Sequence, residues 1–302
     1  MASAESDYLV NLYRSWTDRM TAAPEMDLAT LRDIFEEWHL PTREPEGVSY
    51  AQVDAGGVGA MWCIPEGCAA DRVLFYSHGG GFVVGSMHSH RKLAGHMAKA
   101  AGTRALVVDF RRAPENPFPA QLEDAVIAFR WLLGQGVRPE HVATTGDSAG
   151  GNLSVTLPLK LRDEGVPLPA AVMPMSPWLD MEVTGESLQS RVAVDALVTM
   201  SLHEAMVSMF LGEARRDDPL ANPLHADLTA LPPMLIQVGD HETLLDDSVR
   251  LAQLAQKAGV EVVLEVAPEM QHVFQFMAGR ASEADEAIAR MAAWVRPRLG
   301  LV

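Results

Sequence analysis

The amino-acid sequence predicts an α/β fold, in which a mostly parallel central sheet is flanked by helices and overlaid by a helical cap. First, short apolar and β-branched runs alternate with helix-like stretches from about residue 70 onward, as in sheets that helices cover on both faces. Second, 302 residues with 48% hydrophobic content suit one large domain, with or without an added lid. Third, residues 1–45 and 179–225 interrupt the alternation. We interpret both as cap segments over the C-terminal ends of the strands, where such sheets place their sites.

The N-terminal region predicts helices within residues 6–40, because apolar residues recur there at a spacing near 3.6. Asp27 or Thr30 is expected to cap the second of these helices. A hairpin is expected next, in "VSYAQVDAGGVGAMWCIP", because Gly56 and Gly57 divide a strand-like run.

The alternating part gives the core, which we expect to span residues 46–178 and 226–302 on either side of the second cap segment. Strands are predicted where apolar β-branched residues cluster, and helices where the apolar period is 3.6. In chain order they are the strand "RVLFYSHGG", a helix over 89–101, the strand "RALVVDF", the helix "QLEDAVIAFRWLLGQ", the strand "HVATTGD", a helix over 152–164, the strands "AAVMPMSP" and "PPMLIQVG", the helix "LDDSVRLAQLAQKAG", the strand "VEVVLEVAP" and a helix through "EADEAIARMAAWV".

The formal net charge of −16 argues against nucleic acid or an anionic membrane surface as a partner. No segment has the roughly 18 uninterrupted apolar residues of a membrane span, and the N-terminus carries early acids in place of an export signal, so a cytoplasmic protein is expected. Cys63 and Cys68 are too few for a structural zinc site and are expected to be free thiols. His88 and His90 form an H-x-H pair without a carboxylate partner, which indicates a loop before a helix and no metal site.

The stretch "GDSAG", residues 146–150, presents a serine between glycines where an apolar run gives way to a helix-like segment. It fits G-x-S-x-G, a pattern that needs a strand, a turn tight enough to admit only small residues, and a helix whose N-terminal amides point at the reacting atoms. Ser148 is therefore the candidate nucleophile. The alternative is a glycine-rich turn without chemistry; a base, an acid and donors for an oxyanion separate the two interpretations.

A second glycine-rich stretch, "YSHGGGFVVGS", follows directly on an expected strand. Without Cβ atoms, its glycines allow the backbone to approach a substrate closely and to adopt positive φ. We expect the N–H groups of Gly80, Gly81 and Ala149 to form an oxyanion hole beside Ser148. The stretch does not match phosphate-binding patterns, and a flexible turn is the alternative.

Together, H-G-G-G and the later G-D-S-A-G-G resemble the hormone-sensitive-lipase-like branch of the α/β-hydrolases. The stretch "DFRRAPENPFPAQLEDA" is similar to that family's D-Y-R-L-A-P-E-H-x-F-P-A segment, although Phe110, Arg112 and Asn116 replace its tyrosine, leucine and histidine. The resemblance runs from about residue 70 to 300. It implies an α/β-hydrolase fold, a serine carboxylesterase without a metal or organic cofactor, a preference for short acyl chains, and a role for His78 in holding the glycine loop.

The order nucleophile, acid, histidine in this fold selects the base. His272, in "APEMQHVFQFM", matches the family's G-x-x-H-x-F position. For the acid the family reads D-P-L-x-D-E, and keeping its leucine in register places Glu242 on the aspartate, so that a glutamate would orient the histidine ring. Asp240 remains the alternative acid. Asp246 and Asp247 are expected in the first turn of a helix, where negative charge is favourable.

The substrate pocket is expected to have apolar walls, which favour neutral acyl groups of short to medium length. Its candidate residues lie beside the oxyanion loop, after a core strand, on the cap helix "LHEAMVSMFLG" and beside the histidine. They are Phe82, Trp178, Met209, Phe210, Val273 and Phe274. Membership of the core is the alternative for each of them.

Several activities fit the same residues. The stretches "ETLLDDS" and "EMQHVFQ" resemble the monoterpene epsilon-lactone hydrolases of this group, so a cyclic ester is the alternative to an open-chain ester. An amidase or deacetylase would use the same triad. A non-catalytic small-molecule binding protein is the remote alternative, because relatives that became receptors lost the base and this chain keeps all three residues. By the family's habit, the strand "VEVVLEVAP" would pair with a second copy in a homodimer.

Overall fold

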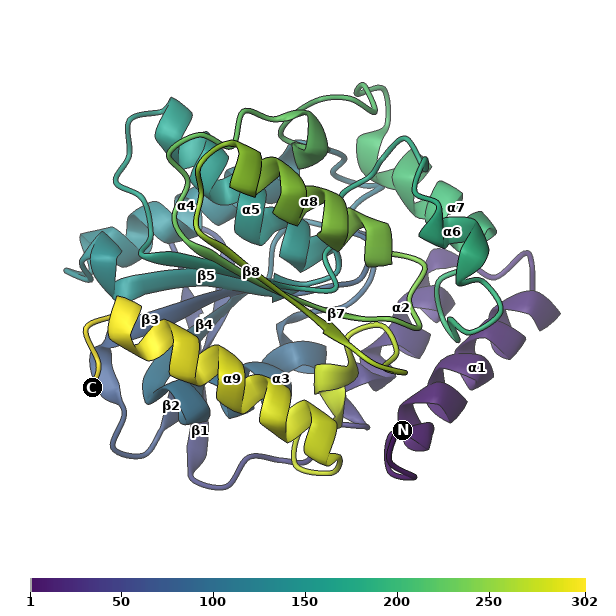
Figure 1. Cartoon of the computed structure of the whole chain (residues 1–302), viewed down its shortest axis with the longest axis horizontal. Coiled ribbons are helices and arrows are strands. Elements are labelled where there is room, and N and C mark those ends of the chain that lie inside the picture. The colour runs from purple at the N-terminus through teal and green to yellow at the C-terminus, as the bar shows by residue number, and fades with distance from the viewer. Residues whose placement is uncertain (1) are drawn as a thin grey trace.

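The centre of the molecule is an eight-stranded sheet with the strand order β1-β2-β4-β3-β5-β6-β7-β8 (Figure 1). The computed structural model describes residues 2–302. Strands β3 to β8 run parallel, whereas β2 is antiparallel to both of its neighbours. This is the mostly parallel sheet that the sequence predicts. The strands are β1 (Val48–Asp54), β2 (Gly59–Pro65), β3 (Ala69–Ser77), β4 (Thr103–Val108), β5 (Val142–Asp147), β6 (Ala171–Met175), β7 (Met234–Gly239) and β8 (Val262–Ala267).

Helices cover both faces of the sheet, with α3 and α9 on one side and α4, α5 and α8 on the other (Figure 1). Because both faces are covered, every residue of β5, β6 and β7 is buried. The long helices are α1 (Asp7–Ala22), α2 (Leu28–Glu36), α3 (Met87–Ala101), α4 (Ala120–Gly134), α5 (Ala149–Asp163), α7 (Met200–Leu211), α8 (Leu245–Lys257) and α9 (Ser282–Arg298); the short ones are α6 (Ser187–Ser190), η1 (Glu37–His39), η2 (Pro139–His141), η3 (Pro223–His225) and η4 (Phe274–Met277).

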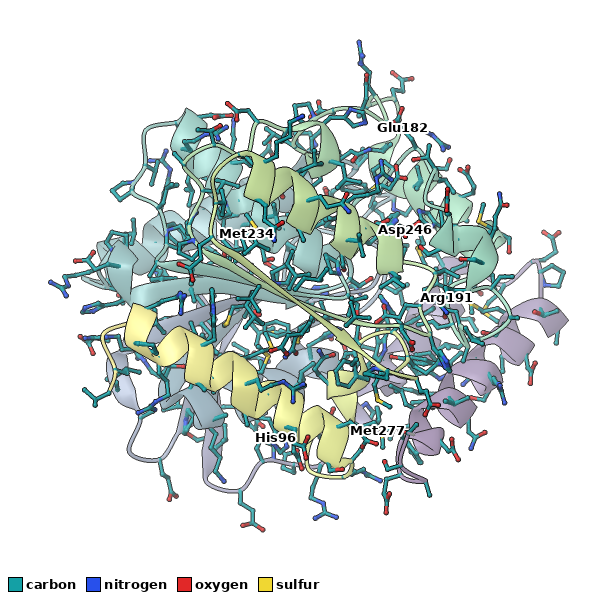
Figure 2. The ribbon with its side chains drawn as sticks, in the orientation of Figure 1. His96, Glu182, Arg191, Met234, Asp246 and Met277 are labelled. Atoms are coloured by element: carbon teal, nitrogen blue, oxygen red, sulfur yellow. The ribbon has the colours of Figure 1, made fainter. Side chains whose placement is uncertain are left out.

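The cap helices α1, α2, α6 and α7 gather beyond the end of the sheet at which β5 and β7 finish (Figure 1). Glu182, before α6, and Arg191, directly after it, lie in the second cap segment (Figure 2). Aromatic contacts anchor the N-terminal part: the ring of Trp16 lies 5.3 Å from that of Phe35, and Trp38 stacks on Phe276 at 5.8 Å. The division of the chain at residues 45, 178 and 225 stays a prediction.

One helix start agrees with the sequence and another differs from it. The N-terminal region divides into α1 and α2 at residues 23–27, and the side chain of Asp27, one of the two expected caps, accepts from the N–H of Thr30 at the start of α2. α3 begins at Met87, because the hydroxyl of Ser86 caps it. The expectation of a loop at His88 and His90 was therefore wrong, since both lie in the first turns of α3.

The remaining expectations concern cysteines and membranes. Cys63 and Cys68 are both free thiols, and burial raises the pKa of the Cys63 thiol to about 12. Within residues 2–302, no helix combines the length and the apolar character that crossing a membrane would require.

Candidate active site

Ser148 lies in the sharp turn between β5 and α5, where its backbone adopts φ 53° and ψ −118°. This conformation is unfavourable for a residue with a side chain. The neighbouring glycines permit it: a Cβ on Gly146 would lie 2.4 Å from the carbonyl oxygen of Ser77, and one on Gly150 would lie 1.9 Å from the same oxygen. Only glycine fits at both positions, so the turn closes tightly around Ser148.

Two hydrogen bonds to the end of the next strand fix the backbone of Ser148. Its N–H donates to the carbonyl of Met175 at 3.0 Å, and its carbonyl accepts from the N–H of Trp178 at 3.0 Å. The side chain borders a cavity that His272 also borders. The fold thus brings the serine and the histidine predicted from the sequence to one site.

His272 and Glu242 form a buried pair, in which Nδ1 of the histidine lies 2.8 Å from Oε2 of the carboxylate. The other oxygen, Oε1, accepts from the hydroxyl of Ser176 at 2.7 Å and from the N–H of Gly239 at 2.5 Å. These donors hold the carboxylate in one orientation. Because Nδ1–H faces the carboxylate, Nε2 is the nitrogen left to accept a proton.

The pKa of His272 is raised above its ordinary value. Burial acts to lower it, but the hydrogen bond from the ring to Glu242 and the negative charge of that carboxylate outweigh burial. The charges of Asp195 and Asp147 act in the same direction. The ring is therefore a stronger base than a solvent-exposed histidine.

Asp240, the alternative acid, lies outside this pair. Its Oδ1 accepts from the N–H of Glu269 at 2.5 Å and lies 3.8 Å from Nε2 of His241. The structure brings Glu242, and not Asp240, to the histidine. Asp246 and Asp247 lie in the first turn of α8, as the sequence predicts.

The glycine-rich loop after β3 approaches the turn at Ser148. Gly80 and Gly81 have φ of 114° and 58° and border the same cavity. A Cβ on Gly80 would lie 2.1 Å from the carbonyl oxygen of Val84, so glycine is required there. Ala149 is the first residue of α5, where the N–H groups have no partner within the helix. Backbone N–H groups from two segments are thus available near the serine.

A buried polar network supports the glycine loop; the sequence analysis named His78 for this role but missed Tyr76, His90 and Asp147. Asp147 accepts from the hydroxyl of Tyr76 at 2.6 Å and from the N–H of Gly79 at 3.2 Å, and its Oδ2 lies 3.2 Å from Nε2 of His90. Nδ1 of His78 lies 2.8 Å from the carbonyl oxygen of Gly79. Burial, with the nearby His90 adding to it, lowers the pKa of His78 to about 4, so this ring stays neutral. It contributes the hydrogen bond at Nδ1 and stacks on the ring of Phe110 at 4.1 Å.

The cavity beside Ser148 has a volume of about 50 Å³ and is largely apolar. Both parts of the cap and the core contribute to its wall. The lining residues are Phe35, Trp38, Gly80, Gly81, Val84, Ser148, Trp178, Leu197, Val198, Leu202, His203, Met206, Leu244 and His272. Of the six pocket candidates, Trp178 alone lines it.

The other candidates lie outside this lining. Phe82 is fully buried, and its ring stacks on that of Phe210 at 3.9 Å. Val273 is fully buried, and its N–H donates to the hydroxyl of Ser176. Met209 and Phe274 also lie outside the lining. On α7 the lining face is Leu202, His203 and Met206, a spacing of three and four residues that the sequence already contained.

Comparison with known proteins gives a consistent result across sequence and structure. A family model for the alpha/beta hydrolase fold matches residues 74–276. A crystal structure of an esterase from the bacterial hormone-sensitive lipase (HSL) family has a TM-score of 0.95 at 41% identity, covering 99% of this chain and all of that one. The structure of EstE5 soaked with p-nitrophenyl butyrate has a TM-score of 0.92 at 37% identity, again covering 99% of this chain and all of that one.

The relatives found by comparing sequences are also named as hydrolases. An acetyl-hydrolase of Streptomyces hygroscopicus is 40% identical over 300 residues, which cover 92% of this chain and 98% of the relative. The putative acetyl-hydrolase LipR of Mycobacterium tuberculosis is 32% identical over 280 residues, covering 92% of this chain and 90% of the relative.

Proposed function

We propose, from the premise that this chain belongs to the hormone-sensitive-lipase family of α/β-hydrolase-fold esterases and is a carboxylic ester hydrolase, that Ser148, Glu242 and His272 are its catalytic triad. This assignment rests on the pair of His272 and Glu242, in which Nδ1 lies 2.8 Å from Oε2, because His272 also borders the same cavity as Ser148. The strained backbone of Ser148 supports the role of nucleophile, because strain of this kind is retained where it presents a reactive side chain.

The chemistry follows from these positions. Oγ of Ser148 attacks the ester carbonyl while Nε2 of His272 takes its proton, and Glu242 stabilises the imidazolium that forms. The N–H groups of Gly80, Gly81 and Ala149 would stabilise the tetrahedral oxyanion. His272 then protonates the leaving alcohol. Water attacks the acyl-enzyme with the same base, which releases the acid and restores the serine.

The substrate class we propose is an ester of a short, uncharged carboxylic acid. A cavity of about 50 Å³ is small beside the roughly 300–1,000 Å³ of common ligand pockets, which favours a short acyl group. The walls around it are mostly apolar. The names of the acetyl-hydrolases and the butyrate ester soaked into EstE5 agree with this size. A lactone presents the same carbonyl, and open-chain esters, cyclic esters and amides can be compared in one assay.

The triad is tested by hydrolysis of p-nitrophenyl esters from acetate to palmitate. We expect Ser148→Ala to lower kcat by about 10⁶-fold and Glu242→Gln by about 10⁴-fold, as for triads in which the nucleophile or the orienting acid is removed. Asp240→Asn is the matched control and should change kcat less than threefold. Loss of activity in Asp240→Asn, with Glu242→Gln still active, would show that the acid is misassigned.

We also propose that β8 mediates a homodimer. It is the last strand of the sheet and pairs only with β7, and its Val266 is 42% exposed. An unpaired strand edge is a template for pairing with a second copy. Light scattering that shows a monomer at micromolar concentration would refute the dimer.

A further inference from the structure

We infer that Asp195 and Gln271 are positioning residues that hold one wall of the catalytic pocket and the loops of the catalytic acid and base in a single hydrogen-bonded unit. The wall consists of residues 194–198, called here the wall segment. The inference rests on the proposed triad, since it concerns the residues beside Glu242 and His272.

Asp195 joins the wall segment to the loop of the acid. Its Oδ1 accepts from the N–H groups of Leu197 and Val198, both at 2.9 Å. Its Oδ2 accepts from the N–H of Thr243 at 2.8 Å and from its hydroxyl at 2.9 Å. Thr243 directly follows Glu242. Each oxygen of one carboxylate thus binds one of the two segments.

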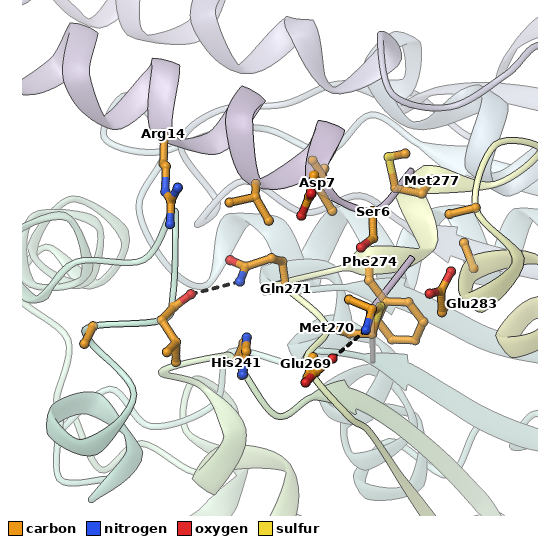
Figure 3. Close-up of a pocket in the computed structure, with 17 residues that line it drawn as sticks. Ser6, Asp7, Arg14, His241, Glu269, Met270, Gln271, Phe274, Met277 and Glu283 are labelled. Carbon is orange, nitrogen blue, oxygen red and sulfur yellow. Dashed lines mark hydrogen bonds between the residues drawn. The ribbon is translucent and has the colours of Figure 1, made fainter. Parts of the chain in front are cut away.

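Gln271 joins the same segment to the loop of the base, since it directly precedes His272. Its Oε1 accepts from the N–H of Ala196 at 2.8 Å, and its Nε2 donates to the carbonyl of Val194 at 2.9 Å. Figure 3 shows the side chain of Gln271 making this second hydrogen bond, drawn as a dashed line. Both ends of the amide are occupied by the wall segment.

Helix α1 binds the unit from outside. The hydroxyl of Tyr13 donates to the carbonyl of His272 at 2.9 Å, and the hydroxyl of Thr17, one turn later, donates to the carbonyl of Ala196 at 3.0 Å. The N-terminal cap helix therefore contacts the base and the wall segment with successive turns.

The wall segment separates two empty spaces, and this is why its hydrogen bonds matter. On one side Leu197 and Val198 line the catalytic cavity. On the other side Val194 and Gln271 line a second cavity of about 320 Å³, the one shown in Figure 3. Ala196 and Leu197 pack into the hydrophobic core, but open volume borders the segment at Val194 and at Leu197 and Val198. Hydrogen bonds to Asp195 and Gln271 therefore add to packing where the segment faces open volume.

Removing these hydrogen bonds should change the base and the pocket together. Asp195→Asn leaves one oxygen acceptor in place of two, so that either Thr243 or the pair Leu197 and Val198 loses its partner. We expect kcat/KM for p-nitrophenyl butyrate to fall about tenfold, which corresponds to about 1.4 kcal/mol. We also expect a similar fall in the rate at which diethyl p-nitrophenyl phosphate inactivates the enzyme, a reaction that reports on the nucleophile.

The pH profile separates positioning from stability. Burial lowers the pKa of His272, whereas Glu242 and, to a smaller extent, the charge of Asp195 raise it. Asp195→Asn should therefore move the acid limb of kcat/KM to lower pH. Gln271→Met, which removes the hydrogen bonds and no charge, should lower kcat/KM without moving that limb. Thr243→Val, which removes one hydroxyl donor, replaces Asp195→Asn if the latter does not fold.

Asp180→Asn is the matched control. This carboxylate is also saturated, by the N–H groups of Glu182 and Thr184 among others, but it contacts neither catalytic loop. The inference would be overturned if Asp195→Asn and Gln271→Met lowered only the melting temperature, as Asp180→Asn does. In that outcome kcat and KM, referred to the concentration of titrated active sites, would equal those of the parent. A parent enzyme that the phosphate does not label at Ser148 would instead refute the proposed triad.

Discussion

The length of acyl chain that the enzyme accepts should be set by Met206. Its side chain lies on the oxyanion loop, where a Cβ built on Gly81 would be 2.9 Å from its sulfur, and it closes the cavity beside Ser148 from the side of α7. Met206→Ala removes three heavy atoms from a wall around about 50 Å³. Space for about three methylene groups is opened, if the surrounding side chains keep their positions.

The size of the effect follows from burial of those groups. Each methylene transferred from water contributes about 0.8 kcal/mol, or about fourfold in kcat/KM. In Met206→Ala, kcat/KM for an ester whose acyl chain is three carbons longer should therefore rise about 50-fold relative to kcat/KM for the shorter ester. The ratio of kcat/KM for p-nitrophenyl heptanoate to that for the butyrate measures this directly, with active sites titrated so that misfolded enzyme does not enter the ratio.

Met209→Ala is the control for this measurement, because Met209 lies on the same helix and outside the cavity lining. It should leave the ratio unchanged within about threefold, the effect of less than one methylene. An equal shift in both variants would mean that general loosening of α7 relaxes the specificity. A ratio unchanged in Met206→Ala would mean that the acyl chain occupies another part of the site.

Three further outcomes follow from the structure. Ser176→Ala removes the hydrogen bonds to the carboxylate of Glu242, the proposed acid, and to the N–H of Val273, so kcat should fall about 10–100-fold with KM unchanged in steady-state assays. An unchanged kcat would contradict a role of Ser176 in holding Glu242. Gly150→Ala should prevent folding, because its Cβ would overlap a carbonyl oxygen, whereas Gly134→Ala, with open space around it, should keep or raise the melting temperature. Burial raises the pKa of Asp247 to about 7, so the folded state binds the proton of this carboxyl more tightly than the unfolded state does. The stability that this proton contributes to the parent is lost as pH rises from about 4 to 7. The melting temperature of Asp247→Asn minus that of the parent should therefore increase between pH 5.5 and 8, and a constant difference would refute the shifted pKa.

Local motifs made much of the fold and the site predictable. The strands of the core follow from clusters of apolar β-branched residues and its helices from an apolar period of 3.6 residues. The turn at Ser148 follows from glycines that only a tight strand-to-helix turn requires. Glu242 was preferred as the acid because a leucine kept the register of its motif, although an aspartate lay two residues earlier, and the structure places Glu242 beside His272. In each case the information is contained in a few neighbouring residues.

The pocket was harder to predict because its walls come from segments that meet only in the folded chain. Phe82 was expected to face the substrate because it adjoins the glycine-rich loop, yet its ring is fully buried and stacks on that of Phe210. His90 was missed because its partner, Asp147, lies 57 positions away in the chain. The contacts of Asp195 and Gln271 likewise depend on how the cap packs, which no local pattern encodes.

The hydrogen bond between Tyr13 and the carbonyl of His272 spans 259 positions, and this separation has a consequence during biosynthesis. At about 5–20 residues per second, a ribosome needs roughly 10–50 s to make the base after it has made α1. Throughout that interval Tyr13 lacks its acceptor at His272, and Trp16 can contact the rings of Phe35 and Trp38 but not the rest of the core. The first helix to be synthesised is therefore among the last to dock, and it exposes an apolar stripe that chaperones can bind until the C-terminal loop emerges.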